Sequence, residues 1–521
     1  MPHGSTSSSD VTAPRSRFYQ GPFGRLFDEL DPWRPTDATG RPITDADALQ
    51  QWALGIANTL MIEFPDGGPP SPPAGIDEDA ADLKFGSSIP AGYTYFGQFI
   101  DHDITFDPTS SLQRENDPNR LLNFRTPRLD LDNLYGRGPD DQPYLYDPDS
   151  EPSAAKFLLG DVAETTLHDL PRNSTGRALI GDPRNDENSI VSQLHLAFLS
   201  AHNELVDRAV AQGLADPFTA ARTTLRWLYQ WVVWHDFVKR IVDPVVHGVA
   251  LNRDLTADGR VVWNRGLKEI YSWRDQPYMP VEFSGAAYRF GHSLVRSKYK
   301  TNIIRGAADV DFVPIFDNTT DGDIDDLRGF RPIGVKNAIE WDWFLPMTSS
   351  IGEFPQRAHQ IDTKLTNALA FLHEGAPGSA NNVLAARNLL RGIRLELPAG
   401  RDVARKIGLD PIDLDPGEPD SLWFYILKEA ETTTSGERLG AVGSVIVAAV
   451  FAGLLAGDPR SWINIEPGWT PASDPLLRPG VDNKDDAGLQ EKWKLASIIR
   501  IAGVPTSAAD FRAAQPAVPV P

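Results

Sequence analysis

The chain has 521 residues, of which 41% are hydrophobic and 9% aromatic, so it can bury a large core and is not wholly disordered. Lys and Arg together number 50 against 71 for Asp and Glu, which gives a formal net charge of −21. This charge opposes binding to nucleic acid or to anionic lipid. No cysteine is present, which excludes disulfides, thiolate catalysis and cysteine-ligated metals.

The N-terminal segment is expected to be an extension outside the main domain. Its first 20 residues are polar and Ser-rich and lack the apolar stretch of a classical signal peptide. We therefore expect them to be disordered, and the protein to be cytoplasmic or exported by a non-classical route. The stretch TDADALQQWALGIANTLM (44–61) predicts one amphipathic helix, which Thr44 and Asp47 would cap. Residues 1–60 thus read as an extension with one amphipathic helix.

Helical patterns dominate after the Pro- and Gly-rich stretch 65–75, which separates the extension from the main domain. Residues 187–210 predict an amphipathic helix, and residues 219–242 are apolar nearly all round, which indicates central burial. No series of strands separated by turns is found. The sequence therefore predicts a mainly α fold with little β-structure.

Residues 439–457 carry no charge and are long enough to span a bilayer. We favour a buried core helix, because Arg438 and Asp458 close the stretch tightly and no second span accompanies it. We therefore expect no membrane span. The Pro- and Ala-rich end of the chain, residues 506–521, is expected to be a flexible tail.

The stretch FGQFIDHDITF (96–106) combines one histidine with two aspartates and one glutamine in an otherwise apolar run. In a helix that turns about 100° per residue, Gln98 and His102 share one face while Asp101 and Asp103 point to either side. The histidine can therefore serve one partner and the carboxylates two others.

Three further segments place two polar residues three apart, a spacing at which helical neighbours face one object. Each pair alone is typical of a surface ion pair, but together with FGQFIDHDITF they suggest one shared target. The three pairs are Arg184 with Glu187, Arg289 with His292, and Asn388 with Arg391.

The ordered segments FGQFIDHDITF, TPRLDLDNLYG, GDPRNDEN, YRFGHSLV and RNLLRG resemble those of the myeloperoxidase-like, or animal-type, haem peroxidase superfamily. The later block from LWFYILKEAE to GLLAGDP is similar to that of its bacterial members. The resemblance covers about residues 60–505. It implies a single large helical haem-peroxidase domain over residues 61–505.

On this resemblance, three residues form the side of the haem where peroxide reacts. His102 matches the distal histidine that takes a proton from H₂O₂ and returns it to the departing oxygen, a role suited to imidazole. Arg184 matches the distal arginine, whose charge stabilises the anion that develops as the O–O bond breaks. Gln98 matches the distal glutamine associated with halide and water.

Four residues match the opposite, proximal side and the haem edge. His292 matches the axial ligand of the haem iron, and Asn388 the residue that hydrogen-bonds its other ring nitrogen. Arg289 and Arg391 match arginines near the haem edge and propionates, where charge pairing is expected.

Covalent attachment of the haem is also implied. Asp101 and Glu187 match the two carboxylates that form ester bonds, so an ester-linked derivative of haem b is expected. Asn188 stands where myeloperoxidase has a methionine that makes a sulfonium link. That link must be absent here, which argues against efficient chloride oxidation.

The segment TPRLDLDNLYG together with Asp103 matches the calcium site of the superfamily. Thr126, Arg128, Asp130 and Asp132 alternate, so in an extended chain they would project to one side and offer hard oxygen ligands. Arg128 would contribute only its carbonyl. A bound Ca²⁺ would then anchor the helix that carries His102.

The function implied is that of a haem peroxidase, which reduces H₂O₂ by way of a ferryl radical state and oxidises a donor. The donors allowed are small anions (bromide, iodide or thiocyanate) and phenols. The alternative within the superfamily is a fatty-acid α-dioxygenase or cyclooxygenase, which needs a tyrosine three residues before the proximal histidine. That position holds Arg289, and Tyr288 is one residue off. A third possibility is a non-catalytic haem-bearing interaction module, and the oligomeric state is left open.

Overall fold

A computed structural model describes most of the chain. Residues 1–20 and 65–75 lie outside the described part, so the expectations for these two segments are not addressed. The described residues are 21–62, 86–106, 122–123, 125–251, 253–255, 261–263, 267, 269–271, 277–303, 312–316, 326–347, 355–370, 372, 379–477 and 493–514.

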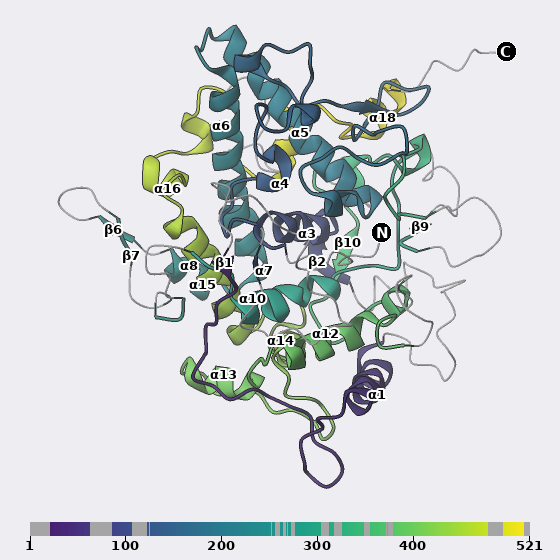
Figure 1. The fold of residues 1–521 in the computed structure, drawn as a ribbon, viewed down its shortest axis with the longest axis vertical. Coiled ribbons are helices and arrows are strands. Elements are labelled where there is room, and N and C mark those ends of the chain that lie inside the picture. Colours follow the sequence, from purple (N-terminus) through teal and green to yellow (C-terminus); the bar gives the residue numbers. More distant parts are fainter. Residues whose placement is uncertain are drawn as a thin grey trace, which may run out of the picture.

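The described chain is mainly helical, which confirms the predicted fold class (Figure 1). The α-helices are α1 (Ala46–Ile56), α3 (Gly92–Ile104), α4 (Asp132–Tyr135), α5 (Ser189–Ala211), α6 (Pro217–Val232), α7 (Lys239–Ile241), α8 (Pro244–Ala250), α10 (Val281–Gly285), α12 (Leu384–Arg394), α13 (Gly400–Lys406), α14 (Leu422–Thr434), α15 (Ala441–Gly457), α16 (Trp462–Ile465), α17 (Leu495–Ala502) and α18 (Ala508–Ala513). Short 3₁₀ or π turns include η1 (Ala57–Met61), η5 (Pro183–Asp186), η6 (Val233–Val238) and η7 (Ala287–His292).

Strands in the described ranges form only two-stranded antiparallel pairs. They are β1 (Gly21–Pro22) with β3 (Leu122–Asn123), β2 (Gly86–Pro90) with β10 (Arg357–His359), β4 (Gly160–Asp161) with β5 (His168–Asp169), β6 (Arg253–Leu255) with β7 (Val261–Trp263), and β8 (Lys298–Tyr299) with β9 (Val313–Pro314). Because none of these pairs grows into a larger sheet, helix packing forms the core.

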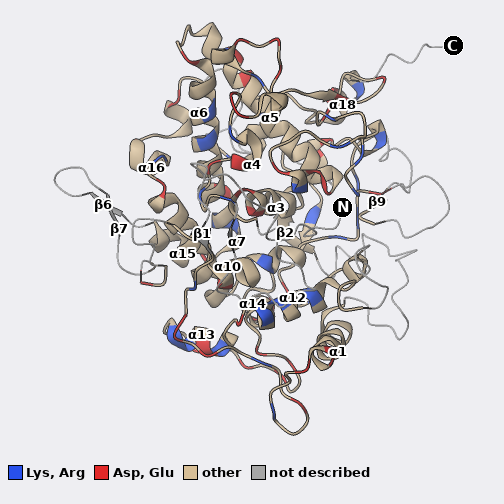
Figure 2. Cartoon of the chain, in the orientation of Figure 1, with Lys and Arg blue, Asp and Glu red and all other residues tan. Residues whose placement is uncertain are grey.

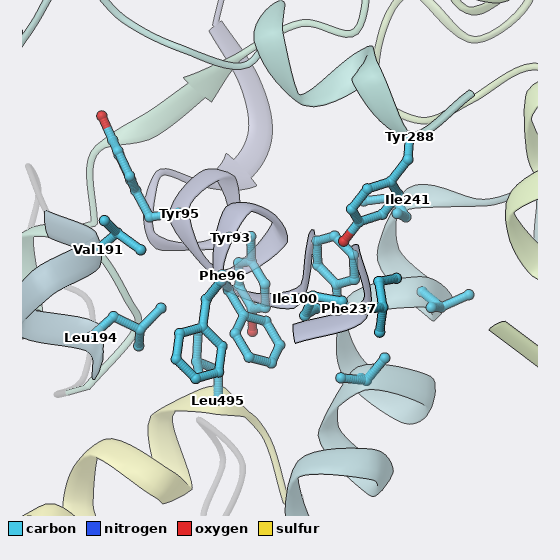
Figure 3. Packing of buried hydrophobic residues seen from close by; sticks show 14 of the residues in the cluster. Tyr93, Tyr95, Phe96, Ile100, Val191, Leu194, Phe237, Ile241, Tyr288 and Leu495 are labelled. Carbon is cyan, nitrogen blue, oxygen red and sulfur yellow. The ribbon is translucent and has the colours of Figure 1, made fainter. Parts of the chain in front are cut away.

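Helix α3 lies at the centre of the molecule, between α5 and α6 on one side and α10, α12 and α14 on the other (Figure 1). Its apolar side chains explain this position, because Phe96, Phe99 and Ile100 are fully buried. Figure 3 shows Phe96, Ile100, Phe237 and Tyr288 packed around this helix. The polar residues of α3 are therefore held in the interior.

Helix α15 is the uncharged stretch for which a buried core helix was predicted. It lies within the core, and Val442, Ile446, Val450 and Leu454 have no exposed surface. Among the described residues, no helix is long and apolar enough to cross a bilayer. The prediction of a core helix is therefore confirmed.

The charged side chains lie mainly on the outer helices and loops, with both signs on α13 and several arginines on α12 (Figure 2). Helix α15 is free of charge in the same view. Several ionisable groups lie in the interior, among them Asp132 on α4 and His102 on α3, which belong to the candidate site.

Three local expectations were wrong. Asp45, not Thr44, caps α1, because its carboxylate accepts from Ala48 N–H at 2.8 Å. Residues 508–513 of the expected flexible tail form α18, whose Phe511 is fully buried and supplies the anchor that composition did not reveal. Residues 126–131 are bent rather than extended, with Leu131 in the left-handed region at φ 59°.

Candidate functional site

His102 is held in the interior by residues from two other segments. Its Nδ1 lies 2.7 Å from Oδ1 of Asn185, a residue of η5. Burial, followed by the charge of Arg184, lowers the pKa of His102 to about 4. The imidazole is therefore neutral at neutral pH, which leaves a ring nitrogen able to accept a proton.

The other face of His102 meets Glu187. His102 Nε2 is 3.8 Å from Glu187 Oε1, and Gln98 Nε2 donates to the same oxygen. Asn188 Nδ2 donates to Gln98 Oε1 at 3.1 Å. The structure thus brings Gln98, His102 and Glu187 together, and the first two share one face of α3 as the helical spacing predicted.

Arg184 is fixed against the end of α3. Its Nη2 donates to the carbonyl oxygens of His102 at 3.1 Å and Thr105 at 2.6 Å, and the guanidinium forms an ion pair with buried Asp182 at 2.8 Å. Its Nη1 makes no hydrogen bond to any described residue. Arg184 therefore brings a fixed positive charge close to His102.

Asp101 and Asp103 leave α3 in different directions from His102. Thr105 Oγ1 donates to Asp101 Oδ1 at 2.9 Å, and Leu131 N–H donates to Asp103 Oδ2 at 3.2 Å. The charge of Asp101 also acts on Arg289 of η7. The three neighbouring residues thus face three different partners.

Asp103, Asp130 and Asp132 form a cluster in which one carboxylate oxygen of each lies within 4.8 Å of the others. Burial, with the neighbouring Asp132 and Asp130, raises the pKa of Asp103 well above its usual range. Burial raises the pKa of Asp132 to about 7. The three buried carboxylates repel one another when they are ionised. A bound cation that prefers oxygen ligands would offset this repulsion.

The other two predicted calcium residues lie beside this cluster. Thr126 Oγ1 donates to Asp130 Oδ1 at 2.9 Å, whereas Arg128 Nε is 4.0 Å from Asp458 Oδ1. The side chain of Arg128 therefore points to another carboxylate. Ligation by the oxygens of Thr126 and by the carbonyl of Arg128 stays a prediction.

His292 lies at the end of η7, on the other side of α3 from the cluster of aspartates. Its Nδ1 is 2.7 Å from Nδ2 of Asn388 on α12, and a half-turn of the amide places Oδ1 there to accept the Nδ1 proton. Burial, followed by the charges of Arg289 and Arg391, lowers the pKa of His292 well below its usual value. A neutral imidazole is the form that binds a metal.

The segment that carries His292 is tied directly to α3. Tyr288 Oη donates to the carbonyl of Gly97 at 3.1 Å, next to Gln98. The Arg289 guanidinium is buried, its Nε makes no hydrogen bond to a described residue, and its pKa is lowered by burial. The structure therefore brings Asp101, Arg289, Asn388 and Arg391 into the surroundings of α3 and His292.

Sequence reasoning missed several residues of this site. Asp182 forms ion pairs with both Arg184 and Arg125, and Asn185 lies between His102 and a second buried histidine, His195. The pattern Asp-Pro-Arg, in which Pro fixes the start of a turn, could have pointed to Asp182. Local spacing carried no signal for the link between His102 and Asn185, which are 83 positions apart.

Part of the chain is similar to known haem peroxidases. A family model described as animal haem peroxidase matches residues 110–305. The chorion peroxidase of Drosophila melanogaster is 24% identical over 414 residues, which is 76% of this chain and 44% of that protein. Both matches agree with the resemblance to the animal-type haem peroxidase superfamily. The chain spans less than half the length of this curated relative.

Solved structures share the fold of this chain. Peroxidase A from Dictyostelium discoideum has a TM-score of 0.57 at 17% identity, with 95% of this chain and 93% of that chain covered. The fatty acid alpha-dioxygenase of Oryza sativa has a TM-score of 0.53 at 16% identity, covering 82% and 76% of the two chains. The enzyme of the same description from Arabidopsis thaliana has a TM-score of 0.52 at 15% identity, covering 90% and 79%. At these identities the likeness establishes the fold alone.

The match to the animal haem peroxidase family model implies a haem cofactor, and the residues present fit one. The positive charges of Arg289, Arg387 and Arg391 all act on His292, and the buried Nε of Arg289 lacks a hydrogen bond to the described residues. A group with two propionates would bring negative charge to these arginines. Neutral His292 offers the nitrogen ligand that haem iron takes in peroxidases.

Proposed function

We propose that this protein is a haem peroxidase that reduces H₂O₂ and oxidises small anions, such as bromide, iodide or thiocyanate, or phenolic donors. The observation that carries the proposal is the combination of neutral His102 and charged Arg184 at the end of α3 with neutral His292 on η7, which is bonded to α3 through Tyr288. This is the set of groups that proton transfer to and from bound peroxide requires.

In the proposed mechanism, His292 would hold the haem, which would supply the two electrons needed to cleave the O–O bond. His102 Nε2 accepts a proton from one oxygen of H₂O₂ and returns it to the other oxygen, which leaves as water. Arg184 holds positive charge where the leaving oxygen becomes negative. Asn388 holds the His292 ring through Nδ1 and so sets its orientation and basicity.

The remaining assignments belong to this proposal. Asp101 and Glu187 would form ester bonds to the haem, Arg289 and Arg391 would pair with its propionates, and Gln98 would hold an anion or a water. Asp103, Asp130 and Asp132 would bind Ca²⁺ together with oxygens of Thr126 and Arg128. Support for the metal comes from the close approach of three buried carboxylates.

Stopped-flow absorbance tests the proposal. The purified protein, reconstituted with haem, is mixed with H₂O₂ with and without bromide, and the Soret band is followed. A rapid shift that bromide reverses supports peroxide reduction and anion oxidation. A shift reversed only by a phenol leaves organic donors as the substrates, whereas absence of any shift refutes the peroxidase.

A matched pair of histidine variants tests the role of His292. His292→Ala should abolish stable haem binding, because it removes the nitrogen ligand. His247→Ala should retain haem, because His247 lies on α8 and contacts Trp234. Uptake of oxygen with a long-chain fatty acid, in the absence of a peroxide reaction, would point to the dioxygenase alternative.

A further inference from the structure

A continuous hydrogen-bonded path joins two buried histidines through one asparagine. Asn185 Oδ1 is 2.7 Å from His102 Nδ1, and Asn185 Nδ2 is 2.9 Å from His195 Nδ1. Asn185 and His195 are fully buried, and His102 is 4% exposed. The three residues come from η5, α5 and α3, so the path crosses three separate elements.

The donors and acceptors of this path constrain one another. In this orientation of the Asn185 amide, Oδ1 can only accept, so His102 Nδ1 carries a proton and its Nε2 is left with a free lone pair. Because Asn185 Nδ2 can only donate, His195 Nδ1 is unprotonated. The His195 proton then lies on Nε2, which makes no hydrogen bond to a described residue.

The reverse arrangement requires all three groups to change together. The Asn185 amide would rotate by a half-turn, His195 Nδ1 would take up a proton, and His102 would move its proton to Nε2. His102 could then no longer accept a proton on the side where Glu187 lies. Burial lowers the pKa of His195 to about 3, so this ring stays neutral and carries one proton in either arrangement.

The surroundings of His102 make such a constraint necessary. Glu187 Oε1 lies 3.8 Å from His102 Nε2 and is an acceptor. On its own it would favour a proton on Nε2, which is the unproductive tautomer. The contact of Asn185 with Nδ1 opposes this preference from the other side of the ring.

We propose that Asn185 and His195 are positioning residues that hold His102 in the tautomer whose Nε2 lone pair faces the reaction site. The proposal rests on the proposed function, because it concerns the proton acceptor of that reaction. Neither residue touches the reactants. Their effect passes through the ring of His102, as the aspartate of a catalytic triad acts through its histidine.

Cyanide binding measures this tautomer without turnover. Hydrogen cyanide binds ferric haem as the anion, so its H–C bond breaks, the proton passes to His102 Nε2, and no electron is transferred. Asn185→Leu removes both hydrogen bonds, and His195→Phe leaves the amide free to rotate. Each should slow cyanide association at pH 7 by about 10- to 100-fold, the usual effect of losing the partner of a functional histidine.

Two further variants separate positioning from packing. His195→Gln offers an oxygen that can accept from Asn185 Nδ2, so it should restore most of the cyanide rate. His202→Phe is the matched control, because His202 is equally buried on the same helix but bonds Tyr135 and Ala155. It should lower thermal stability and leave the rate of cyanide binding unchanged.

The outcomes separate this proposal from the proposed function. If the parent protein binds no haem, the proposed function fails. If the parent binds haem and cyanide while Asn185→Leu and His195→Phe bind cyanide at the parental rate, the positioning role is refuted. Should both variants lose haem, ¹⁵N NMR of the histidine-labelled parent decides: a protonated Nδ1 on His102 supports the proposal, and a protonated Nε2 refutes it.

Discussion

Arg184 combines two tasks in one side chain. Its Nη2 holds the carbonyls of His102 and Thr105 at the end of α3, and its charge lies close to the His102 ring. A lysine can supply the charge but lacks the planar fork whose Nε and Nη2 bind the two oxygens of Asp182. The arginine therefore sets both the position of His102 and the electrostatics around it.

Arg184→Ala should slow the reaction with H₂O₂ by about 10²- to 10³-fold, because a fixed charge at the developing anion is lost. Arg184→Lys should retain part of the rate. Stopped-flow mixing of the haem-bound variants with peroxide measures both. Arg208→Ala is the control, since Arg208 also bonds a carboxylate and a backbone carbonyl but lies toward the end of α5. Equal rates for all of them would contradict the role of Arg184.

Glu429 is a buried acid outside the site. Burial raises its pKa to about 7, above the ordinary 4.5, although Val442 and Gly443 at the start of α15 donate N–H groups to it. The folded state therefore holds the proton more tightly than the unfolded chain. This adds stability below about pH 4.5, and the contribution is lost as the pH rises through 7.

Glu429→Gln should remove this pH dependence. Relative to the parent, the free energy of unfolding of the variant should rise between pH 5 and pH 8 by on the order of 3 kcal/mol. Urea titrations at several pH values measure the difference. Exposed Glu466→Gln serves as the control and should follow the parent. A constant offset between Glu429→Gln and the parent would refute the prediction.

At the residue scale, sequence segments were informative where function requires a fixed local pattern. Helical spacing predicted that Gln98 and His102 share one face of a helix and that Asp101 and Asp103 point to either side of it. The contacts of these four residues in the structure agree with this prediction. The hydrogen-bond partners of these residues could not be predicted from helical spacing. Asn185 and His195 act across elements, and their pairing depends on how η5 and α5 pack on α3.

At the scale of elements, α3 is held from both of its sides. Asp103 belongs to the aspartate cluster, while Tyr288 of η7 bonds the carbonyl of Gly97, nearly two turns earlier in the helix. The position of α3, the helix that carries His102, therefore depends on how the charge of the aspartate cluster is neutralised. Removal of a cation would leave only Arg125 beside Asp132 and Arg460 beside Asp130 to offset the repulsion among the three carboxylates.

Chelation should consequently loosen α3. Dialysis against EDTA is expected to lower the melting temperature, to increase hydrogen exchange in residues 92–104, and to be reversed by Ca²⁺ in preference to Mg²⁺. Asp130→Asn should weaken calcium binding at least tenfold, because one of three charged ligands is lost. Calcium titration by calorimetry measures the affinity. Full stability and unchanged exchange in EDTA would refute the site.

Element boundaries were predicted less well than the elements. Helices were correctly placed over α5, α6 and α15 by apolar periodicity or by unbroken apolar composition. The end of the predicted helix 219–242 is interrupted by the π turn η6. Helix α18 escaped prediction because a single buried residue, Phe511, anchors it against a tertiary contact that composition does not reveal.

At the scale of the whole molecule, the N-terminal arm joins distant parts of the domain. Arg25 donates to the carbonyls of Leu395 and Glu396 beyond α12, and Gly24 pairs with Pro280 before α10. Glu282 of α10 is fully buried and accepts from the backbone N–H groups of Leu26 and Phe27. The carboxylate of Glu282 thus fixes Phe27, which lies 255 positions earlier in the sequence.

Glu282 variants test whether this arm stabilises the whole domain. Glu282→Leu leaves two buried N–H groups without an acceptor and should reduce the free energy of unfolding by about 2–4 kcal/mol. Glu282→Gln keeps one acceptor oxygen and should lose less than half as much. Thermal unfolding followed at the Soret band and in the far ultraviolet distinguishes a global effect from a local one. Because α10 leads directly into η7, we expect the haem to dissociate and the helices to unfold at the same temperature in the Glu282→Leu variant. Loss of helical signal without loss of the Soret band would show that the arm stabilises only its own surroundings.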